Sequence, residues 1–277
     1  MAPHPRGTLG RPPIRQSVRD GRTGREGDDQ TPPVDSGTLI PAAVPEDTPS
    51  ALRHVRLFEG LAPQDLRQVS HSLDIRHYRP GEFIFHMGEQ ADRLYFLDQG
   101  IVKVTMVSLD GRERILDVIS KGNMFGESSL SDEKSRTVAA QSLNVVTVRT
   151  MSVEAFTRLM VTRPNFCLNF ARHLMDLQRR TQVRLHAQMQ VDRGVRLLAV
   201  LLDLGERCGQ RTDDHCTLPA ELTQGELAQM VGLNRSTVSV LLNFYRRIGI
   251  LGGHGGVIVI HPIPARALIK QAGILPS

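Results

Sequence analysis

The chain has 277 residues, of which 40% are hydrophobic and 23% charged, so it is long and apolar enough for two globular domains, and no apolar run reaches the length of a membrane span. The first twenty residues lack the apolar core of a secretory signal, and three scattered cysteines are too few for a disulfide framework, so we expect a cytoplasmic protein. The net charge of +5 suits an anionic partner such as DNA, although this signal alone is weak.

Residues 1–50 have the composition of a disordered segment. They contain nine of the sixteen prolines and no Phe, Tyr or Trp, and their six arginines nearly cancel seven acidic residues. Such a segment buries too little apolar surface to offset the entropy lost on ordering, so we expect an N-terminal extension without a fold of its own. An arm that follows the DNA backbone is disfavoured, because its arginines alternate with acids.

Residues 51–163 are predicted to form a β-roll that begins with a short helix near Pro63. Between about Ile75 and Thr150, short alternating apolar runs are separated by glycines about ten residues apart, which is typical of a small all-β barrel or roll. The dipeptide Asp110-Gly111 between two such runs is a strong signal for a hairpin turn.

Residues 164–192 are predicted to form one long helix with a single apolar stripe. The stripe consists of Phe170, Leu174, Leu177, Thr181, Leu185 and Met189. A helix this long needs a partner, and the same helix of a second copy is the simplest one, so we expect a homodimer. The alternative is a helix that packs only against its own β-roll.

Residues 193–277 are predicted to fold as a winged helix-turn-helix. Thr223 and Glu226 form a capping box at the start of one helix, Gly232 ends that helix, and Asn234 caps a second. Val238, Leu241, Leu242 and Tyr245 share the buried side of the second helix. The two apolar runs on either side of residues 252–256, which are rich in glycine, predict a hairpin that forms the wing.

A recognition helix enters the major groove of DNA with its N-terminal residues foremost. We therefore expect Arg235 to bond to a guanine, while residues near the helix ends bind phosphates. The predicted DNA-binding residues are Thr223, Gln224, Asn234, Arg235, Ser236, Ser239, Val240 and Arg246. The alternative is a winged helix that binds protein.

Residues 121–138 contain the parts of a nucleotide cradle. Gly126 permits close approach of a ligand, and the residues after it can form a single helical turn. Arg136 offers a fixed fork of donors to a phosphate, next to the hydroxyl of Thr137. Glu127 is an acceptor suited to a ribose hydroxyl. We expect these side chains to line one cavity.

These motifs resemble those of the CRP/FNR family of regulators over about residues 50–265. Residues 80–82, 94–97, 122–127 and 136–137 resemble a cyclic-nucleotide-binding domain, and residues 222–238 resemble the helix-turn-helix of the same family. The resemblance implies an α+β chain with a cyclic-nucleotide-binding jelly roll, a long dimerisation helix and a C-terminal winged helix-turn-helix. It implies a transcription regulator, an activator or else a repressor. The sequence contains no nucleophile–base motif and no Walker loop, so we expect no enzymatic activity.

The resemblance also implies a ligand, partners and site residues. Cyclic AMP, or else cyclic GMP, would act as allosteric ligand without a metal, and the homodimer would bind double-stranded DNA and contact RNA polymerase. Glu127 would hold the ribose and Arg136 the phosphate, and Thr181 falls where cyclic-AMP-binding members place a threonine against the purine. The implied ligand-binding residues are Gly126, Glu127, Ser128, Arg136, Thr137 and Thr181.

This chain departs from the family's pattern at several of these positions. Ser128, Val138 and Gln182 replace the usual residues of the nucleotide site, which leaves the identity of the ligand open. Ser236 and Val240 stand where the cyclic-AMP receptor protein has a glutamate and an arginine, so we expect a different operator.

Other functions have weaker support. An iron–sulfur sensor needs a cysteine cluster near the N-terminus, and residues 1–166 contain no cysteine. Haem ligation by His77 or His86 and zinc binding by Cys208, His215 and Cys216 lack a supporting pattern. Two alternatives to nucleotide gating remain: a DNA-binding regulator that is active without a nucleotide, and a nucleotide sensor whose helical module binds protein.

Overall fold

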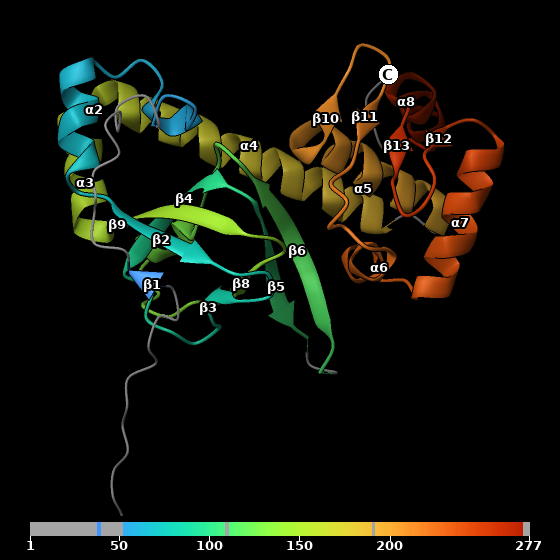
Figure 1. The fold of residues 1–277 in the computed structure, drawn as a ribbon, viewed down its shortest axis with the longest axis horizontal. Helices are drawn as coiled ribbons and strands as arrows, with labels where there is room; N and C mark the ends of the chain where they lie inside the picture. Colours follow the sequence, from blue (N-terminus) through green and yellow to red (C-terminus); the bar gives the residue numbers. More distant parts are fainter. Residues whose placement is uncertain (1–37, 40–51, 109–110, 190–191, 274–277) are drawn as a thin grey trace, which may run out of the picture. The chain divides into compact units, whose positions relative to one another are not determined.

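The structure, a computed structural model, describes residues 38–39, 52–108, 111–189 and 192–273 (Figure 1). Most of the segment predicted to be disordered therefore lies outside the described residues. Within it, Thr38–Leu39 form β1, which pairs antiparallel with β2. Asp110 of the predicted hairpin turn also lies outside, whereas Gly111 has the positive φ of 76° that such a turn needs.

Residues 74–152 form the β-roll that the glycine spacing predicts. Its strands are β2 (Asp74–Tyr78), β3 (Phe83–Phe85), β4 (Arg93–Gln99), β5 (Ile101–Val107), β6 (Glu113–Ser120), β7 (Met124–Phe125), β8 (Ala139–Ser142) and β9 (Val146–Ser152). They form two antiparallel sheets, in the orders β1-β2-β9-β4-β7 and β3-β8-β5-β6. Neighbours that are far apart in sequence, such as β4 and β9, are typical of a jelly roll, and this confirms the predicted fold of the domain.

Apolar side chains from both sheets meet in the core of the roll. The buried set includes Tyr78, Ile84, Leu97, Val102 and Val148. A second cluster lies where three helices cover one end of the roll: the 3-10 helix η1 (Arg56–Phe58), α2 (Pro63–Ser70) and α3 (Val153–Thr162). Phe156 packs edge-on against Phe166 there, with ring centroids 5.0 Å apart, and this contact fixes the start of the next helix.

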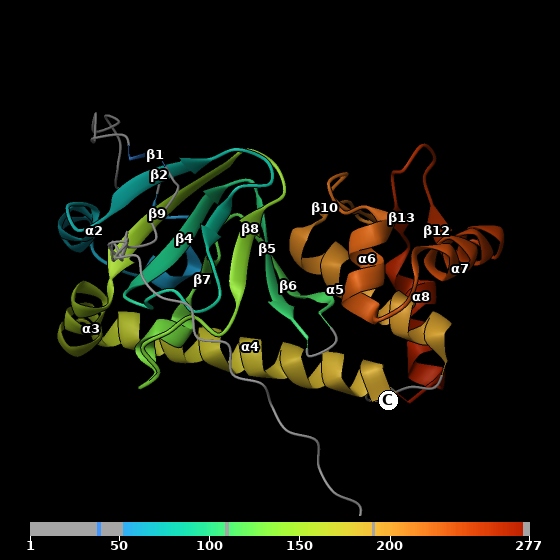
Figure 2. The same ribbon diagram turned by 90° about the horizontal axis from the view of Figure 1, so that it is seen from below.

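The long helix α4 (Pro164–Met189) has 26 residues and lies beside the roll (Figure 2). It is described as far as Met189, and the next helix starts at Arg193, where Asp192 accepts bonds from the amides of Gly194 and Val195. Of the predicted stripe, Phe170 is buried at the end of the roll. Leu185 and Met189 keep 61% and 73% of their surface exposed.

The C-terminal domain contains the predicted helix-turn-helix and elements that sequence reasoning missed. Its elements are α5 (Arg193–Cys208), β10 (Gln210–Arg211), β11 (Cys216–Thr217), α6 (Gln224–Val231), α7 (Arg235–Arg247), β12 (Leu251–Gly252), β13 (Val259–Ile260) and α8 (Pro262–Gln271). The predicted hairpin is β12–β13, and it belongs to a sheet in the order β10-β11-β13-β12. Its core includes Leu197, Leu201, Val238 and Leu242.

The apolar core of the C-terminal domain continues onto the roll. Ile115 and Val118 of β6 are buried in the same cluster as the residues of α5 and α6, and α6 packs against β6. Among the described residues, no helix is both long and apolar enough to cross a membrane.

Candidate nucleotide cavity and DNA-binding face

A cavity of about 240 Å³ lies between the roll and α4. Five of the six predicted ligand-binding residues line it: Gly126, Glu127, Ser128, Thr137 and Thr181. The first three lie at the end of β7, Thr137 lies just before β8, and Thr181 comes from α4. Apolar side chains such as Phe85 and Leu177 complete the walls, so the cavity offers polar groups on one side and apolar surface on another.

Gly126 shapes the polar side of the cavity. Its φ of 82° turns the chain from β7 into the 3-10 helix η2 (Glu127–Leu130), the single turn that the sequence predicts. A Cβ atom at this position would lie 3.0 Å from the ring of Tyr95 and 3.1 Å from Nη1 of Arg136. Only glycine satisfies both the backbone conformation and this close approach.

Arg136 lies behind this turn and is not one of the residues that line the cavity. Its side chain is buried, with Nη1 donating to the carbonyl oxygen of Gly126 at 3.0 Å and Nη2 donating to that of Arg93 at 2.6 Å. Its guanidinium carbon is 4.3 Å from the ring centroid of Phe85. Within the described chain no carboxylate lies at ion-pair distance from it, and Nε has no partner. Burial therefore lowers the pKa of this guanidinium below its ordinary value.

Glu127 is half-buried on the cavity wall. Burial raises the pKa of its carboxyl group, and the negative charge of Asp117 adds to this effect. The positive charges of Arg180 and Arg136 oppose it. A carboxyl group at the cavity wall can accept a hydrogen bond from a ligand hydroxyl.

The C-terminal domain has the predicted helix caps. In the capping box at the start of α6, the amide of Thr223 donates to Glu226 at 2.8 Å, and the amide of Glu226 donates to the Thr223 hydroxyl at 3.3 Å. Gly232 ends α6 with a φ of 70°. Asn234 then accepts from the amide of Thr237 at 2.7 Å and starts α7. These caps fix the turn between the two helices.

The outward face of α7 carries the predicted DNA-binding residues. Arg235, Ser236 and Val240 are exposed there, and Ser239 and Arg246 are half-buried. On α6, Thr223 is exposed at the N-terminus and Gln224 is half-buried. Ser236 and Asn234 are hydrogen-bonded to each other: the Ser236 hydroxyl donates to Oδ1 of Asn234 at 2.9 Å. Arg235 stands at the first turn of α7, where a recognition helix reaches base edges.

Comparison with known proteins agrees with both the cavity of the roll and the helix-turn-helix. Residues 75–163 match the cyclic nucleotide-binding domain, and residues 195–265 match the Crp-like helix-turn-helix domain. A CRP-like cAMP-activated global transcriptional regulator of Mycobacterium tuberculosis is 30% identical over 209 residues, which cover 76% of this chain and 93% of the relative. The chain belongs to the CRP/FNR family.

Further relatives of this CRP/FNR chain extend the comparison. The cAMP-activated global transcriptional regulator CRP of Pasteurella multocida is 27% identical over 188 residues, covering 68% of this chain and 90% of the relative. The structure of FixK2 from Bradyrhizobium japonicum has a TM-score of 0.62 at 20% identity and covers 74% of this chain and 98% of its own. This likeness shows the shared fold. Family members are DNA-binding transcription regulators with a cyclic-nucleotide-binding domain, as the resemblance implied.

Sequence reasoning missed four charged or polar side chains on the cavity wall of this CRP/FNR protein. Asp117 projects from β6, and His173, Arg180 and Arg184 project from α4. The spacing of His173, Leu177, Arg180 and Arg184 places them on one helix face, which was the available signal.

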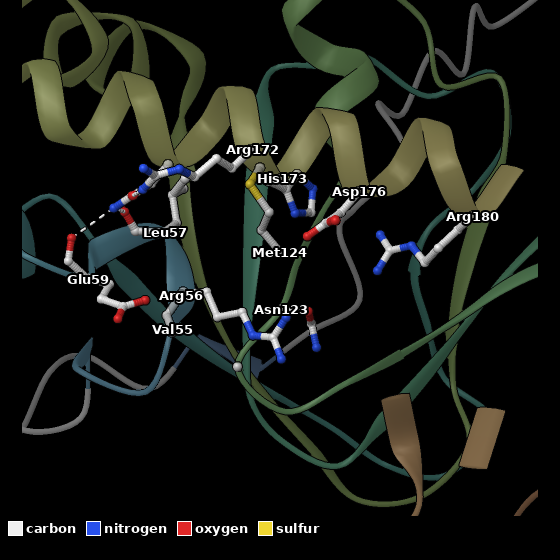
Figure 3. A pocket seen from close by; sticks show the side chains of 12 residues that line it. Val55, Arg56, Leu57, Glu59, Asn123, Met124, Arg172, His173, Asp176 and Arg180 are labelled. Carbon is white, nitrogen blue, oxygen red and sulfur yellow. Dashed lines mark hydrogen bonds between the residues drawn. The ribbon is translucent and has the colours of Figure 1, made fainter. Parts of the chain in front are cut away.

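A smaller cavity of about 180 Å³ adjoins the first and shares Met124, His173 and Arg180 with it. Figure 3 shows His173, Asp176 and Arg180 on α4 facing Asn123 and Met124 across this space. Burial lowers the pKa of His173 to about 4, and the charge of Arg180 adds to the effect. Its imidazole is therefore neutral near pH 7.

The described residues contain no group of three or more His, Cys, Asp or Glu side chains that could hold a metal ion. Of the residues considered as zinc ligands, Cys216 is buried. Nδ1 of His215 lies 3.0 Å from the hydroxyl oxygen of Thr212.

Proposed function

We propose that this CRP/FNR protein is a cytoplasmic, homodimeric transcription regulator whose affinity for DNA is set by a cyclic nucleotide, cyclic AMP first, bound in the 240 Å³ cavity. The observation that carries the proposal is the convergence of Glu127, Ser128, Thr137 and Thr181 on one cavity. Their hydroxyl, carboxyl and amide groups match those that a ribose and a phosphate present. Cyclic AMP is the first nucleotide to test, because the Mycobacterium and Pasteurella relatives are named as cAMP-activated.

Arg136 would hold the phosphate of this nucleotide. Its Nη1 donates to the carbonyl oxygen of Gly126, which lines the cavity. The guanidinium is therefore separated from the cavity by this one residue. A buried guanidinium without a carboxylate partner is stabilised strongly by an anion, and a phosphate offers bidentate acceptors. In this proposal, the phosphate replaces the carbonyl oxygen of Gly126 as the partner of Nη1.

The homodimer would form along α4. Exposed apolar side chains continue along most of this helix: Leu168, Leu174, Met175, Leu185 and Met189, each at least 39% exposed. Such a stripe on a single helix is stabilised when a second copy covers it. A closed dimer with two-fold symmetry also places two recognition helices for two half-sites on DNA.

DNA would meet the outward face of α7, with Arg235 on a base and residues at the starts of α6 and α7 on phosphates. We include Thr223, Gln224, Asn234, Ser236, Ser239, Val240 and Arg246 in this interface. RNA polymerase is the proposed protein partner, because the relatives regulate transcription globally.

Isothermal titration with cyclic AMP and cyclic GMP tests the proposal. We expect saturable binding of at least one nucleotide, and a loss of about 30-fold or more in affinity in Arg136→Gln, since a charge-assisted phosphate contact is removed. Arg79→Gln is the control, because Arg79 is an exposed arginine of the same roll. Equal nucleotide affinities in Arg136→Gln and the wild type would contradict the proposed role of Arg136.

A second candidate function is a regulator that binds DNA without any nucleotide. It is favoured by one observation: two nitrogens of the Arg136 guanidinium are already bonded to protein carbonyl oxygens, those of Gly126 and Arg93. Tight binding to DNA without heat from either nucleotide would support this function. In a third function the helical module binds protein; a steep fall of DNA affinity with salt would argue against it.

A further inference from the structure

Four charged side chains meet where β6, α4 and α5 come together. Arg184 of α4 and Arg207 of α5 each contact both Asp117 of β6 and Asp203 of α5. The N–O distances to Asp117 are 2.5 and 2.9 Å, and those to Asp203 are 3.2 and 3.0 Å. The side chains are only 11% to 22% exposed. We call these four residues the charge cluster.

Main-chain bonds tie the same three elements together. Arg207 Nη1 donates to the carbonyl oxygen of Val118 at 3.1 Å, and Arg184 Nη1 donates to that of Leu116. The hydroxyl of Ser120 donates to the carbonyl oxygen of Arg207 at 3.0 Å. The edge of β6 is thus held against the first helix of the C-terminal domain and against α4 at once.

Burial raises the pKa of Asp117, and the adjacent Arg184 and Arg207 more than offset this, so the pKa lies below its ordinary value. The carboxylate is therefore charged and depends on both arginines. When one member of a buried ion pair loses its partner, the charge that remains is strongly destabilised. The cluster accordingly responds as a unit when any of its contacts changes.

Two members of the charge cluster line the proposed nucleotide cavity, and the other two belong to the C-terminal domain. Asp117 and Arg184 line the cavity together with Glu127 and Thr181. Asp203 and Arg207 belong to α5, which packs against both α6 and α7. An anionic guest in the cavity attracts Arg184 and repels Asp117, which weakens the bonds that hold β6 and α4 to α5.

We propose that the charge cluster is the device that couples occupation of the cavity to the position of the helix-turn-helix, so that neutralising one of its members uncouples nucleotide binding from DNA binding. The proposal rests on the proposed function, because it requires a nucleotide that changes DNA affinity. Coupling between two sites is reciprocal and is measured as the ratio of DNA dissociation constants with and without nucleotide. That ratio reports coupling whichever of the two states of the protein binds DNA more tightly.

Arg207→Gln is the sharpest variant. It removes the charge that α5 gives to Asp117 but keeps a polar side chain of similar length. Arg207 lies in the last turn of α5, does not line the cavity and is not among the proposed DNA-binding residues, so the proposed contacts with nucleotide and DNA would stay intact. Asp203→Asn is a milder second variant, because Asp117 still pairs with both arginines. Retained folding is checked by the thermal unfolding transition.

The matched control is Arg266→Gln. Arg266 of α8 pairs with Glu206 of α5 at 2.5 Å, and both residues belong to the C-terminal domain. This change removes an arginine–carboxylate pair from the same helix α5 without touching β6 or α4. It therefore separates loss of coupling from a general weakening of the domain.

The experiment measures fluorescence anisotropy of a duplex that the full-length wild-type protein enriches from a randomised pool, with and without cyclic AMP or cyclic GMP. We expect a change in DNA affinity of about tenfold or more in the wild type and in Arg266→Gln, within the usual range of allosteric coupling. In Arg207→Gln we expect this factor to fall below about threefold and in Asp203→Asn to an intermediate value, while titration calorimetry still detects the nucleotide.

The outcomes separate the two proposals. An unchanged factor in folded Arg207→Gln and Asp203→Asn would overturn the coupling role and leave the proposed function intact. A wild type that binds DNA equally well with and without either nucleotide would overturn both. If Arg207→Gln does not fold, Asp203→Asn alone decides, because a wild-type factor in that variant contradicts the coupling role.

Discussion

The guanidinium of Arg136 lies 3.0 Å from the carbonyl oxygen of Gly126, the residue at which the chain turns into the cavity wall. The side chain predicted to bind phosphate is therefore joined to the backbone that carries Glu127 and Ser128. A phosphate beside Gly126 competes with this carbonyl oxygen for the same donors. When a nucleotide binds, Arg136 would exchange the carbonyl oxygen of Gly126 for the phosphate. The ribose would bind at the cavity wall that carries Glu127, which is already formed.

Gly126→Ala tests the close approach at this turn. The φ of 82° and the contact of 3.0 Å with Tyr95 both oppose a side chain, so we expect a loss of about 2 kcal/mol in the free energy of unfolding and about tenfold in nucleotide affinity. Gly88→Ala is the control, since Gly88 has a φ of 88° but open space around its Cβ position. Chemical denaturation and calorimetry measure both quantities. Equal effects of the two substitutions would mean that backbone strain alone, and not the cavity wall, is what Gly126 provides.

Leu185→Glu tests the dimer. Leu185 is 61% exposed on the apolar stripe of α4, and each dimer would bury two added carboxylates, so we expect the dissociation constant of the dimer to rise by about 30-fold or more. Sedimentation velocity over a concentration series measures it. Val161→Glu places the same charge on α3 at a valine that is 79% exposed and should leave the association unchanged. If Leu185→Glu sediments as the wild type does, the stripe is not the interface.

Arg235→Ala tests base reading by α7. A bidentate contact from arginine to guanine contributes about 1–3 kcal/mol, so we expect weaker binding and relaxed preference at one base pair of each half-site. Arg246→Ala should instead weaken binding to all sequences alike and reduce the salt dependence, because its predicted partner is a phosphate. Selection from a randomised duplex pool, followed by salt titration, distinguishes the two effects. A sequence preference in Arg235→Ala identical to that of the wild type would rule out its role in base reading.

Local rules explain which parts of the molecule the sequence predicts well. The caps of α6 and α7 depend on residues three positions apart, and the turn at Gly126 depends on a single residue that tolerates positive φ. The alternating runs of the roll and the glycines between them are equally local. The predicted β-roll and helix-turn-helix follow from such patterns, and the structure confirms both.

Long-range contacts explain what the sequence did not predict. The direction of the Arg136 side chain depends on the carbonyl oxygen of Arg93, which is 43 positions away. Asp117 meets Arg207 only because β6 packs against α5. The two-residue strands β10 and β11 are too short for a periodic signal; they pair with each other, and β11 also pairs with the wing strand β13. None of these contacts produces a pattern in the sequence around the residues that make it.

His173 predicts how stability depends on pH. Burial lowers its pKa to about 4, whereas an unfolded histidine has a pKa of about 6.5, so between these values the unfolded chain binds a proton that the folded chain does not. The stabilising contribution of the neutral imidazole is therefore complete above pH 6.5 and is lost as the pH falls toward 4. Between pH 7 and pH 5 the loss is about 2 kcal/mol in the free energy of unfolding.

Urea denaturation at pH 7 and pH 5 measures this loss in the wild type and in His173→Gln. Other groups also titrate in this range, so the test is the difference between the two proteins: we expect the wild type to lose about 2 kcal/mol more than the variant. His71→Gln replaces an exposed histidine and should keep the pH dependence of the wild type. Parallel pH dependence in the wild type and His173→Gln would show that the imidazole of His173 is as readily protonated in the folded chain as in the unfolded one.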